Sequence, residues 1–416
     1  MDLHGFILEH EHDDLAALML QRDRYPSVDM ALATECIASR RKLRLKVPEW
    51  YGDPRLICPA ALSAEQCSST ATARYKATIA ATFADNGGSL RIADLTGGLG
   101  IDCWQFSKVA ESVLYNEMNP LLVGAARENF PRLGCDNVSF SNLCIGPDTL
   151  PDLLDSFKPN LVFADPARRS ASGRKVFLPE DCSPDILTIQ DIILDRGCSM
   201  LLKLSPMADI SLVLRKFHCV KQIHIIEADR ECKELLLLMV PGFDRDAEII
   251  VTDTSLQLSF SLADINGSKP RFIIEPPAQG QLFFEPGPAL SKCGAFNALC
   301  ERFGFLKFGP SAHLYLLPQN LPQLSAFGKC FRVIETAPFG KASLEHFALR
   351  WPEAGVTARA LPLSSDELRQ KIASISRKKT ARTKTPTGST ADRQIHIFGA
   401  GTAAGRLLVA AERTIT

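Results

Sequence analysis

An apolar run that ends in an acid and a glycine-rich turn occupies positions 91–102. Asp94 closes the run, and Gly98 and Gly100 follow where glycine permits positive φ and close approach of a ligand. A dinucleotide fingerprint needs a third glycine at this spacing and a P-loop needs a lysine, and the stretch has neither. Asp94 and Asp102 flank the turn and would repel a pyrophosphate. The stretch therefore favours a ligand that carries a cation or an amine.

A second acid, Glu117, follows the next apolar run along the chain, 113–115, and lies 23 positions after Asp94. An acid at the end of a second strand can accept hydrogen bonds from both ribose hydroxyls of a nucleoside. The two stretches together predict a nucleoside-binding site.

A third acid, Asp165, follows the apolar run 161–164 and precedes Pro166. A carboxylate beside proline-held carbonyl groups can accept hydrogen bonds from a target amine and orient its lone pair for a displacement reaction. Arg168 and Arg169 suit a phosphate or a guanine edge, although such a pair can also belong to a solvated loop.

The strand acid, the glycine turn and the second acid together resemble the nucleoside site of class I S-adenosylmethionine (SAM) methyltransferases. The resemblance implies SAM as the cofactor and a Rossmann-like α/β domain. In that family the first acid and its turn hold the amino-acid end of SAM, and the second acid holds the ribose. The cofactor-binding residues implied here are Asp94, Thr96, Gly97, Gly98, Gly100, Glu117 and Met118. A Rossmann-like domain without a cofactor is the alternative.

The same resemblance suggests two further cofactor contacts. Asn142 matches the position of an acid or amide near adenine, although Cys144 stands where aspartate is common. Gln66 precedes the first strand by about one helix, where several methyltransferases cover the methionine end of SAM. Capping of a helix by Ser68 or Ser69 is the plainer interpretation of that segment.

Asp165-Pro166-Ala167 resembles the (Asp/Asn)-Pro-Pro-x motif of methyltransferases that act on amino groups of bases, but it lacks the second proline and a following aromatic residue. Methylation of a base carbon by covalent catalysis needs a cysteine, and 203–206 lacks the one that uridine enzymes carry. Because that cysteine is absent, transfer to a base nitrogen fits better. Lys203 either faces the cleft or ends a strand. The candidate catalytic residues are Asp165 and Pro166, and the candidate substrate-binding residues are Arg168, Arg169 and Lys203.

Over its length the chain resembles bacterial class I methyltransferases that have a ferredoxin-like segment and a C-terminal THUMP-like domain. Besides the motifs above, the strings 231–236, 285–290 and 311–315 carry this resemblance. THUMP domains bind RNA, so an RNA partner, tRNA or rRNA, is implied. The stretch 369–384 has no acid and several Lys and Arg that could contact phosphates or only keep the chain soluble. We expect an RNA methyltransferase; the alternatives are a protein or small-molecule methyltransferase and a non-catalytic RNA-binding protein with a vestigial SAM fold.

The elements that must position these residues change in type along the chain. Residues 1–80 are rich in helix formers. Residues 81–245 alternate short apolar runs with helical patterns, which predicts a mostly parallel sheet covered by helices on both faces. An α+β part follows, in which the resemblance above implies a ferredoxin-like segment over 246–330 and a THUMP-like domain over 331–416.

Several boundaries are specific enough to test. Single helices are expected over 63–83 and 289–303, and an amphipathic helix over 364–375 precedes a mobile basic segment at 376–393. The apolar residues at 272–274 predict a strand. The segments 394–398 and 407–411 predict a closing hairpin.

The composition excludes several classes of protein. The chain has 416 residues, 46% of them apolar, with 47 basic and 47 acidic side chains, so it is not largely disordered. No apolar run approaches the ~20 residues of a membrane span, and no secretory signal begins the chain. The 13 cysteines lack CxxC spacing and are typical of a reducing cytosol. The acidic, histidine-containing start at 4–14 fits a charged helix better than a metal site. We therefore expect a cytoplasmic protein without a metal or a membrane partner.

Overall fold

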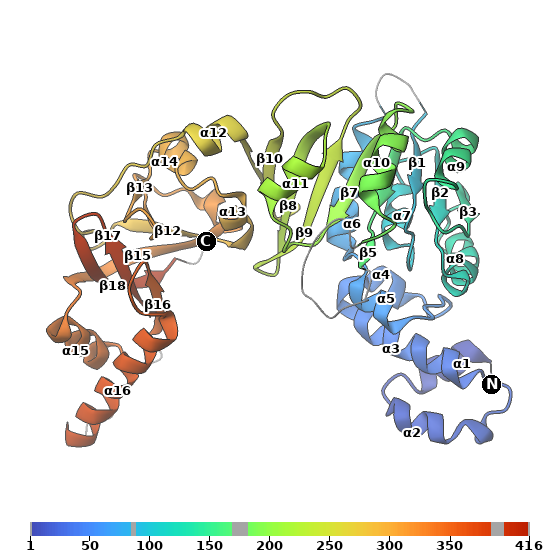
Figure 1. Ribbon diagram of the computed structural model, residues 1–416. Coiled ribbons are helices and arrows are strands. Elements are labelled where there is room, and N and C mark those ends of the chain that lie inside the picture. The colour runs from blue at the N-terminus through green and yellow to red at the C-terminus, as the bar shows by residue number, and fades with distance from the viewer. Residues whose placement is uncertain (1, 85–88, 169–181, 384–394, 415–416) are drawn as a thin grey trace. The chain divides into compact units, whose positions relative to one another are not determined.

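The computed structural model describes residues 2–84, 89–168, 182–383 and 395–414, which form two compact units (Figure 1). Unit 1 comprises residues 1–223 and 234–245, and unit 2 comprises 224–233 and 246–416. The chain thus enters unit 2 briefly, returns to unit 1 and then completes unit 2.

Unit 1 begins with helices, as the composition of 1–80 predicts. They are α1 (Leu3–Glu9), α2 (Leu15–Leu20), α3 (Met30–Lys46), α4 (Pro48–Gly52), α5 (Ala61–Gln66) and α6 (Thr70–Ala81). The prediction of a single helix over 63–83 is wrong, because α5 and α6 are separate helices. Ser69 explains the break: its Oγ accepts a hydrogen bond from the Thr72 N–H at 3.2 Å and caps α6.

The sheet of unit 1 has the order β9-β7-β4-β1-β2-β3, with β8 beside β9 (Figure 1). The pairs among β7, β4, β1, β2 and β3 are parallel, and β9 runs antiparallel to β7. This confirms the mostly parallel sheet. The strands are β1 (Arg91–Asp94), β2 (Ser112–Asn116), β3 (Val138–Ser141), β4 (Leu161–Ala164), β7 (Ser199–Leu204), β8 (Val220–Ala228) and β9 (Glu231–Met239), and β5 (Ala167–Arg168) pairs with β6 (Cys182–Ser183) in a separate ribbon.

The connections place a crevice at one edge of this sheet. Helices α7 (Ile101–Phe106) and α8 (Pro120–Arg132) carry the chain outward from β1 to β3. Helices α9 (Leu150–Phe157) and α10 (Ile186–Leu194) carry it back to β4 and β7, and α11 (Ile210–Lys216) follows β7. Right-handed crossovers in opposite directions put these helix pairs on opposite faces. The strand order therefore reverses between β1 and β4, and ligands bind at the carboxyl ends of strands where this happens.

Unit 2 contains a seven-stranded sheet with the order β13-β14-β12-β15-β18-β17-β16. Strands of the segments 246–330 and 331–416 share this sheet, because β12 pairs with β15. Its strands are β12 (Leu282–Pro286), β13 (Leu306–Lys307), β14 (Tyr315–Leu316), β15 (Gly328–Pro338), β16 (Gly355–Arg359), β17 (Ile395–Thr402) and β18 (Gly405–Arg413). The hairpin of β10 (Glu248–Thr252) and β11 (Gln257–Ser261) precedes it, and the helices are α12 (Leu262–Gly267), α13 (Pro288–Cys293), α14 (Ala298–Phe303), α15 (Lys341–Arg350) and α16 (Ser365–Thr383).

The structure corrects three expectations in unit 2. The helix expected over 289–303 is two helices, because Gly294 ends α13 in the left-handed conformation. The residues 272–274 form one bridge, Phe272 with Lys307, rather than a strand. Helix α16 continues through Thr383, where a mobile segment was expected, and residues 384–393 lie outside the described part of the chain. The closing hairpin is confirmed as β17 and β18.

Three general features of the described residues bear on function. None of their helices is both long and apolar enough to cross a membrane. They contain no group of three or more His, Cys, Asp or Glu side chains that could hold a metal ion. The 13 cysteines all lie in the described ranges and none of them forms a disulfide; eight of them are buried.

Candidate functional site

The turn after β1 is shaped by glycines that tolerate no side chain. A Cβ at Gly97 would lie 2.2 Å from the Tyr115 ring, and one at Gly100 would lie 2.7 Å from the Phe130 ring. Gly98 and Gly100 have φ values of +55° and +94°, which disfavour other residues. The turn therefore exposes backbone directly to the space above it.

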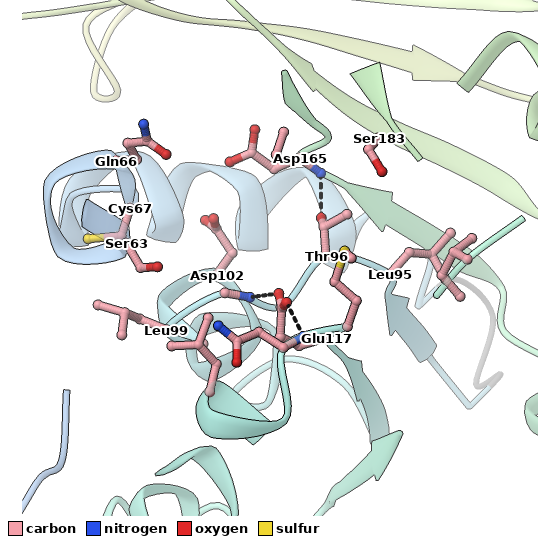
Figure 2. A pocket seen from close by; sticks show the side chains of 18 of the residues that line it. Ser63, Gln66, Cys67, Leu95, Thr96, Leu99, Asp102, Glu117, Asp165 and Ser183 are labelled. Atoms are coloured by element: carbon pink, nitrogen blue, oxygen red, sulfur yellow. Dashed lines mark hydrogen bonds between the residues drawn. The ribbon is translucent and has the colours of Figure 1, made fainter. Parts of the chain in front are cut away.

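Glu117, which follows β2, ties the ends of two strands together. Its Oε2 accepts a hydrogen bond from the Gly98 N–H at 3.0 Å, and its Oε1 accepts one from the Asn119 N–H at 2.8 Å. The Tyr115 hydroxyl donates to the Gly98 carbonyl at 2.6 Å. These contacts hold the carboxylate of Glu117 beside the glycine turn (Figure 2).

Asp94 is a buried acid at the end of β1 and is only 1% exposed. Its Oδ1 accepts a hydrogen bond from the Thr96 N–H at 3.0 Å, whereas Oδ2 has no partner among the described residues. Burial raises the pKa of Asp94 well above its ordinary value, and the nearby acids Asp102, Asp165 and Glu117 raise it further. The turn therefore has acidic groups in excess, which a cationic ligand would balance.

A cavity of about 460 Å³ opens over this turn. In Figure 2 the side chains of Ser63 and Gln66 on α5 and of Cys67, which follows it, lie on one side of the cavity. Leu95 and Ser183 lie on the other side. The size is in the range of small-molecule and cofactor sites. The candidate residues that line it are Gln66, Thr96, Gly97, Gly98, Gly100, Glu117, Met118 and Asp165.

Asp165, just after β4, faces the cavity and is fixed by two contacts. Its backbone N–H donates to the Thr96 Oγ1 at 2.6 Å, which joins the ends of β1 and β4. Its Oδ2 lies 2.6 Å from the Nζ of Lys203 on β7. Burial alone would lower the pKa of Lys203, but the carboxylates of Asp165, Glu234 and Asp102 outweigh burial and raise it. Lys203 is therefore a permanent cation beside Asp165.

Other candidate residues lie around the cavity rather than in its lining. Asp94 and Lys203 are both outside the lining, and Lys203 contacts the lining through Asp165. Asn142 is not in the lining either; its amide donates to the carbonyls of Glu117 and Met118 at 2.7 and 3.0 Å. The structure thus places Asn142 as a support for the Glu117 loop.

The remaining acceptor candidates are described only in part. Pro166 lies between Asp165 and the short strand β5, which contains Arg168. Arg169 lies outside the described residues. The phosphate-binding role expected of both arginines therefore stays a prediction.

Sequence reasoning gave no role in the site to Lys76, Ser68 or Glu234. Lys76 on α6 is fully buried, and its Nζ donates to the Glu234 Oε2 at 2.7 Å and to the Ser68 Oγ at 2.8 Å. Ser68 in turn donates to Asp102, which lines the cavity. A lone lysine within an Ala- and Thr-rich helix was the available signal, but its partner lies 158 positions away.

A solved structure of a presumed methyltransferase from Porphyromonas gingivalis W83 is similar to this chain over its whole length. The chains are 27% identical, the match covers 99% of this chain and 98% of the other, and the TM-score is 0.81. This match confirms the α/β fold class with a helical N-terminal segment. A family model described as a ferredoxin-like domain matches residues 283–323, within the segment where the sequence predicts that fold.

Two other solved structures match part of the chain. One is an rRNA methylase from Streptococcus thermophilus, with 15% identity, coverage of 40% of this chain and 95% of the other, and a TM-score of 0.29. The other is a presumed methyltransferase from Streptococcus mutans in complex with S-adenosylhomocysteine, with 14% identity, coverage of 39% and 93%, and a TM-score of 0.29. No curated protein matches this chain.

Proposed function

We propose that this chain is a SAM-dependent methyltransferase that transfers a methyl group to a base nitrogen of RNA. The observation that carries the proposal is Asp165, which is fixed by Thr96 and Lys203 at the edge of an acidic cavity. The full-length similarity to a presumed methyltransferase supports the enzyme class.

The residues of the cavity fit SAM. Asp94 is buried next to the lining rather than in it, and its unpartnered Oδ2 adds to the acidity that suits the positive charge of this cofactor. The glycine turn lets the cofactor approach the backbone. Glu117 lines the cavity, and we assign its carboxylate to hydrogen bonds from the ribose hydroxyls. When bound, SAM supplies an activated methyl group on a sulfonium.

On the acceptor side the proposed role of the protein is to position the target amine, because the bound cofactor supplies the reactivity. Lys203 holds one oxygen of Asp165, so the carboxylate can turn its other oxygen to a target N–H and orient the nitrogen lone pair. Asp165 then takes up the proton that the methylated nitrogen releases. The Pro166 carbonyl is the second acceptor that we assign to the target amine.

RNA is the proposed partner of the enzyme. Two features support phosphate contacts: the resemblance of the C-terminal sequence to THUMP domains, and the basic run of α16, in which Lys371 and Arg377 are exposed. We assign Arg168 and Arg169 to the phosphate or base of the target nucleotide. A reducing cytosol remains the compartment that the free thiols favour.

The test is transfer of tritiated methyl groups from SAM to total RNA, with Asp165→Ala as the control. Label on an RNA fraction that the variant loses would support the proposal, and digestion would identify the base. SAM binding without labelled RNA would redirect the search to protein or small-molecule acceptors. Absence of SAM binding in calorimetry would favour a non-catalytic RNA-binding protein.

A further inference from the structure

Four buried or half-buried charges of alternating sign lead from helix α6 to Asp165. They begin at Lys76, which is wholly inaccessible to solvent. Its Nζ lies 2.7 Å from the Glu234 Oε2 and 3.1 Å from the Asp102 Oδ1. At the other end, Lys203 lies 2.6 Å from Asp165. Each lysine thus has acids as its nearest ionised neighbours.

The register of the sheet places Glu234 between the two lysines. Lys203 on β7 is paired with Leu236 on β9. Glu234 is two residues from Leu236, so it projects from the same face of the sheet as Lys203 and is its diagonal neighbour. Burial alone would raise the pKa of Glu234, but Lys76 and Lys203 outweigh burial and lower it. Glu234 therefore interacts with both cations.

This arrangement creates a competition for Lys203. Glu234 and Asp165 both attract it, and a buried carboxylate without a partner is costly. Lys76 compensates the charge of Glu234 through a direct hydrogen bond, whereas Lys203 donates its direct hydrogen bond to Asp165. Lys203 is second to Lys76 in its electrostatic influence on Glu234, so removal of Lys76 would leave Lys203 as the main cation acting on this acid.

We propose that Lys76 is a positioning residue that keeps Lys203 on Asp165 by occupying Glu234. The proposal rests on the role assigned to Asp165 in the proposed function. Lys76 does not itself line the cavity, and it contacts two acids, Glu234 and Asp102. Asp102 lines the cofactor side of the cavity, so an effect through Asp102 would change the SAM Kd, whereas the proposed effect through Glu234 and Lys203 changes kcat.

The kinetic test compares Lys76→Met with the double variant Lys76→Met/Glu234→Gln in methyl transfer to total RNA. Lys76→Met is expected to lower kcat at least about tenfold while the SAM Kd changes less than about threefold. The double variant removes the competing acid and should recover kcat to within about threefold of wild type. Loss of kcat that the second substitution does not relieve would overturn the proposal.

A matched control separates positioning from stability. Arg40→Met also removes a buried cation from unit 1, since Arg40 is 5% exposed and lies 3.7 Å from Glu11. It should lower the melting temperature but leave kcat near wild type. An equal fall in kcat in Arg40→Met and Lys76→Met would mean that any lost buried ion pair has this effect, against the proposal.

Crystallography of Lys76→Met gives a readout that needs no acceptor. The Lys203 Nζ is expected to leave Asp165 for Glu234, and an unchanged Lys203–Asp165 contact would overturn the proposal. If the wild type methylates no RNA, the proposed function fails, but the crystal structure of Lys76→Met still tests the positioning role.

If Lys76→Met does not fold, the structure of Glu234→Gln tests the proposal instead. In that variant Lys203 should stay on Asp165. A Glu234→Gln protein that folds and binds SAM but lacks the Lys203–Asp165 contact would contradict the competition between the two acids.

Discussion

The two halves of the candidate site are built in different ways. The cofactor half uses the backbone of one strand–turn–helix–strand unit, and the Gly98 N–H meets Glu117 only 19 positions along the chain. The acceptor half depends on buried charges, and Lys76 and Glu234 lie 158 positions apart. A site can therefore hold its cofactor through local geometry while long-range ion pairs orient the acceptor group.

The largest expected effect separates the two halves. Lys203→Met should lower kcat about 100-fold, because Asp165 loses the cation that fixes it, while the SAM Kd stays within about threefold. Methyl transfer and calorimetry measure the two quantities. The control is Lys108→Met, which removes an ammonium 3.6 Å from the Trp104 ring centroid, away from the cavity. A Kd that rises as much as kcat falls would show that the halves do not act separately.

A smaller effect should be confined to the cofactor half. Gly97→Ala forces a Cβ against the Tyr115 ring, and we expect the turn to shift in order to relieve the clash. A loss of about 2 kcal/mol of binding free energy from the displaced turn would weaken the SAM Kd roughly 30-fold. Gly124→Ala on α8 is the matched control, because no atom lies within 4 Å of the added Cβ. Calorimetry on both proteins makes the comparison. Equal affinities would mean that the turn does not contact the cofactor.

The acidity of the cofactor half predicts a pH dependence. The raised pKa of Asp94 favours its protonated form in the ligand-free cavity, whereas a bound cation favours the carboxylate. SAM binding should therefore release a proton, and affinity should rise with pH by at most about tenfold per unit until the pH exceeds that raised pKa.

Calorimetry in buffers of different ionisation enthalpy measures this proton release. Asp94→Asn should bind SAM with little dependence on pH. A variant that keeps the wild-type pH dependence would assign the proton to another group of the cavity.

The smallest effect tests whether local or tertiary contacts hold α6. Ser69→Ala removes the cap of this helix and should lower the free energy of unfolding by about 1 kcal/mol. Because the ion pairs of Lys76 also fix α6, kcat should stay within about twofold. Urea denaturation and methyl transfer measure the two outcomes, with exposed Ser374→Ala as the control. A fall in kcat beyond tenfold would show that the cap governs the acceptor half as well.

The sequence was most informative where a residue type and a backbone conformation are coupled. Gly98 and Gly100 adopt positive φ. Asp94 is the last residue of β1, and Glu117 and Asp165 directly follow β2 and β4, so the three acids lie at the same edge of the sheet. Apolar periodicity also predicted the alternating strands and helices of 81–245. It failed for the helices at 63–83 and 289–303, because Ser69 and Gly294 interrupt runs of strong helix formers.

The sequence by itself determined the parallel α/β architecture, the glycine turn and the three acids that border it. These features follow from neighbouring residues, since apolar runs define strands and a turn needs specific φ values. The tertiary structure alone decided that Asn142 supports a loop, that Lys203 reaches Asp165 and that Lys76 engages Glu234. Strand order and register bring these groups together. The energy of a buried charge depends on its neighbours in space, and here folding makes neighbours of residues that are far apart in the sequence.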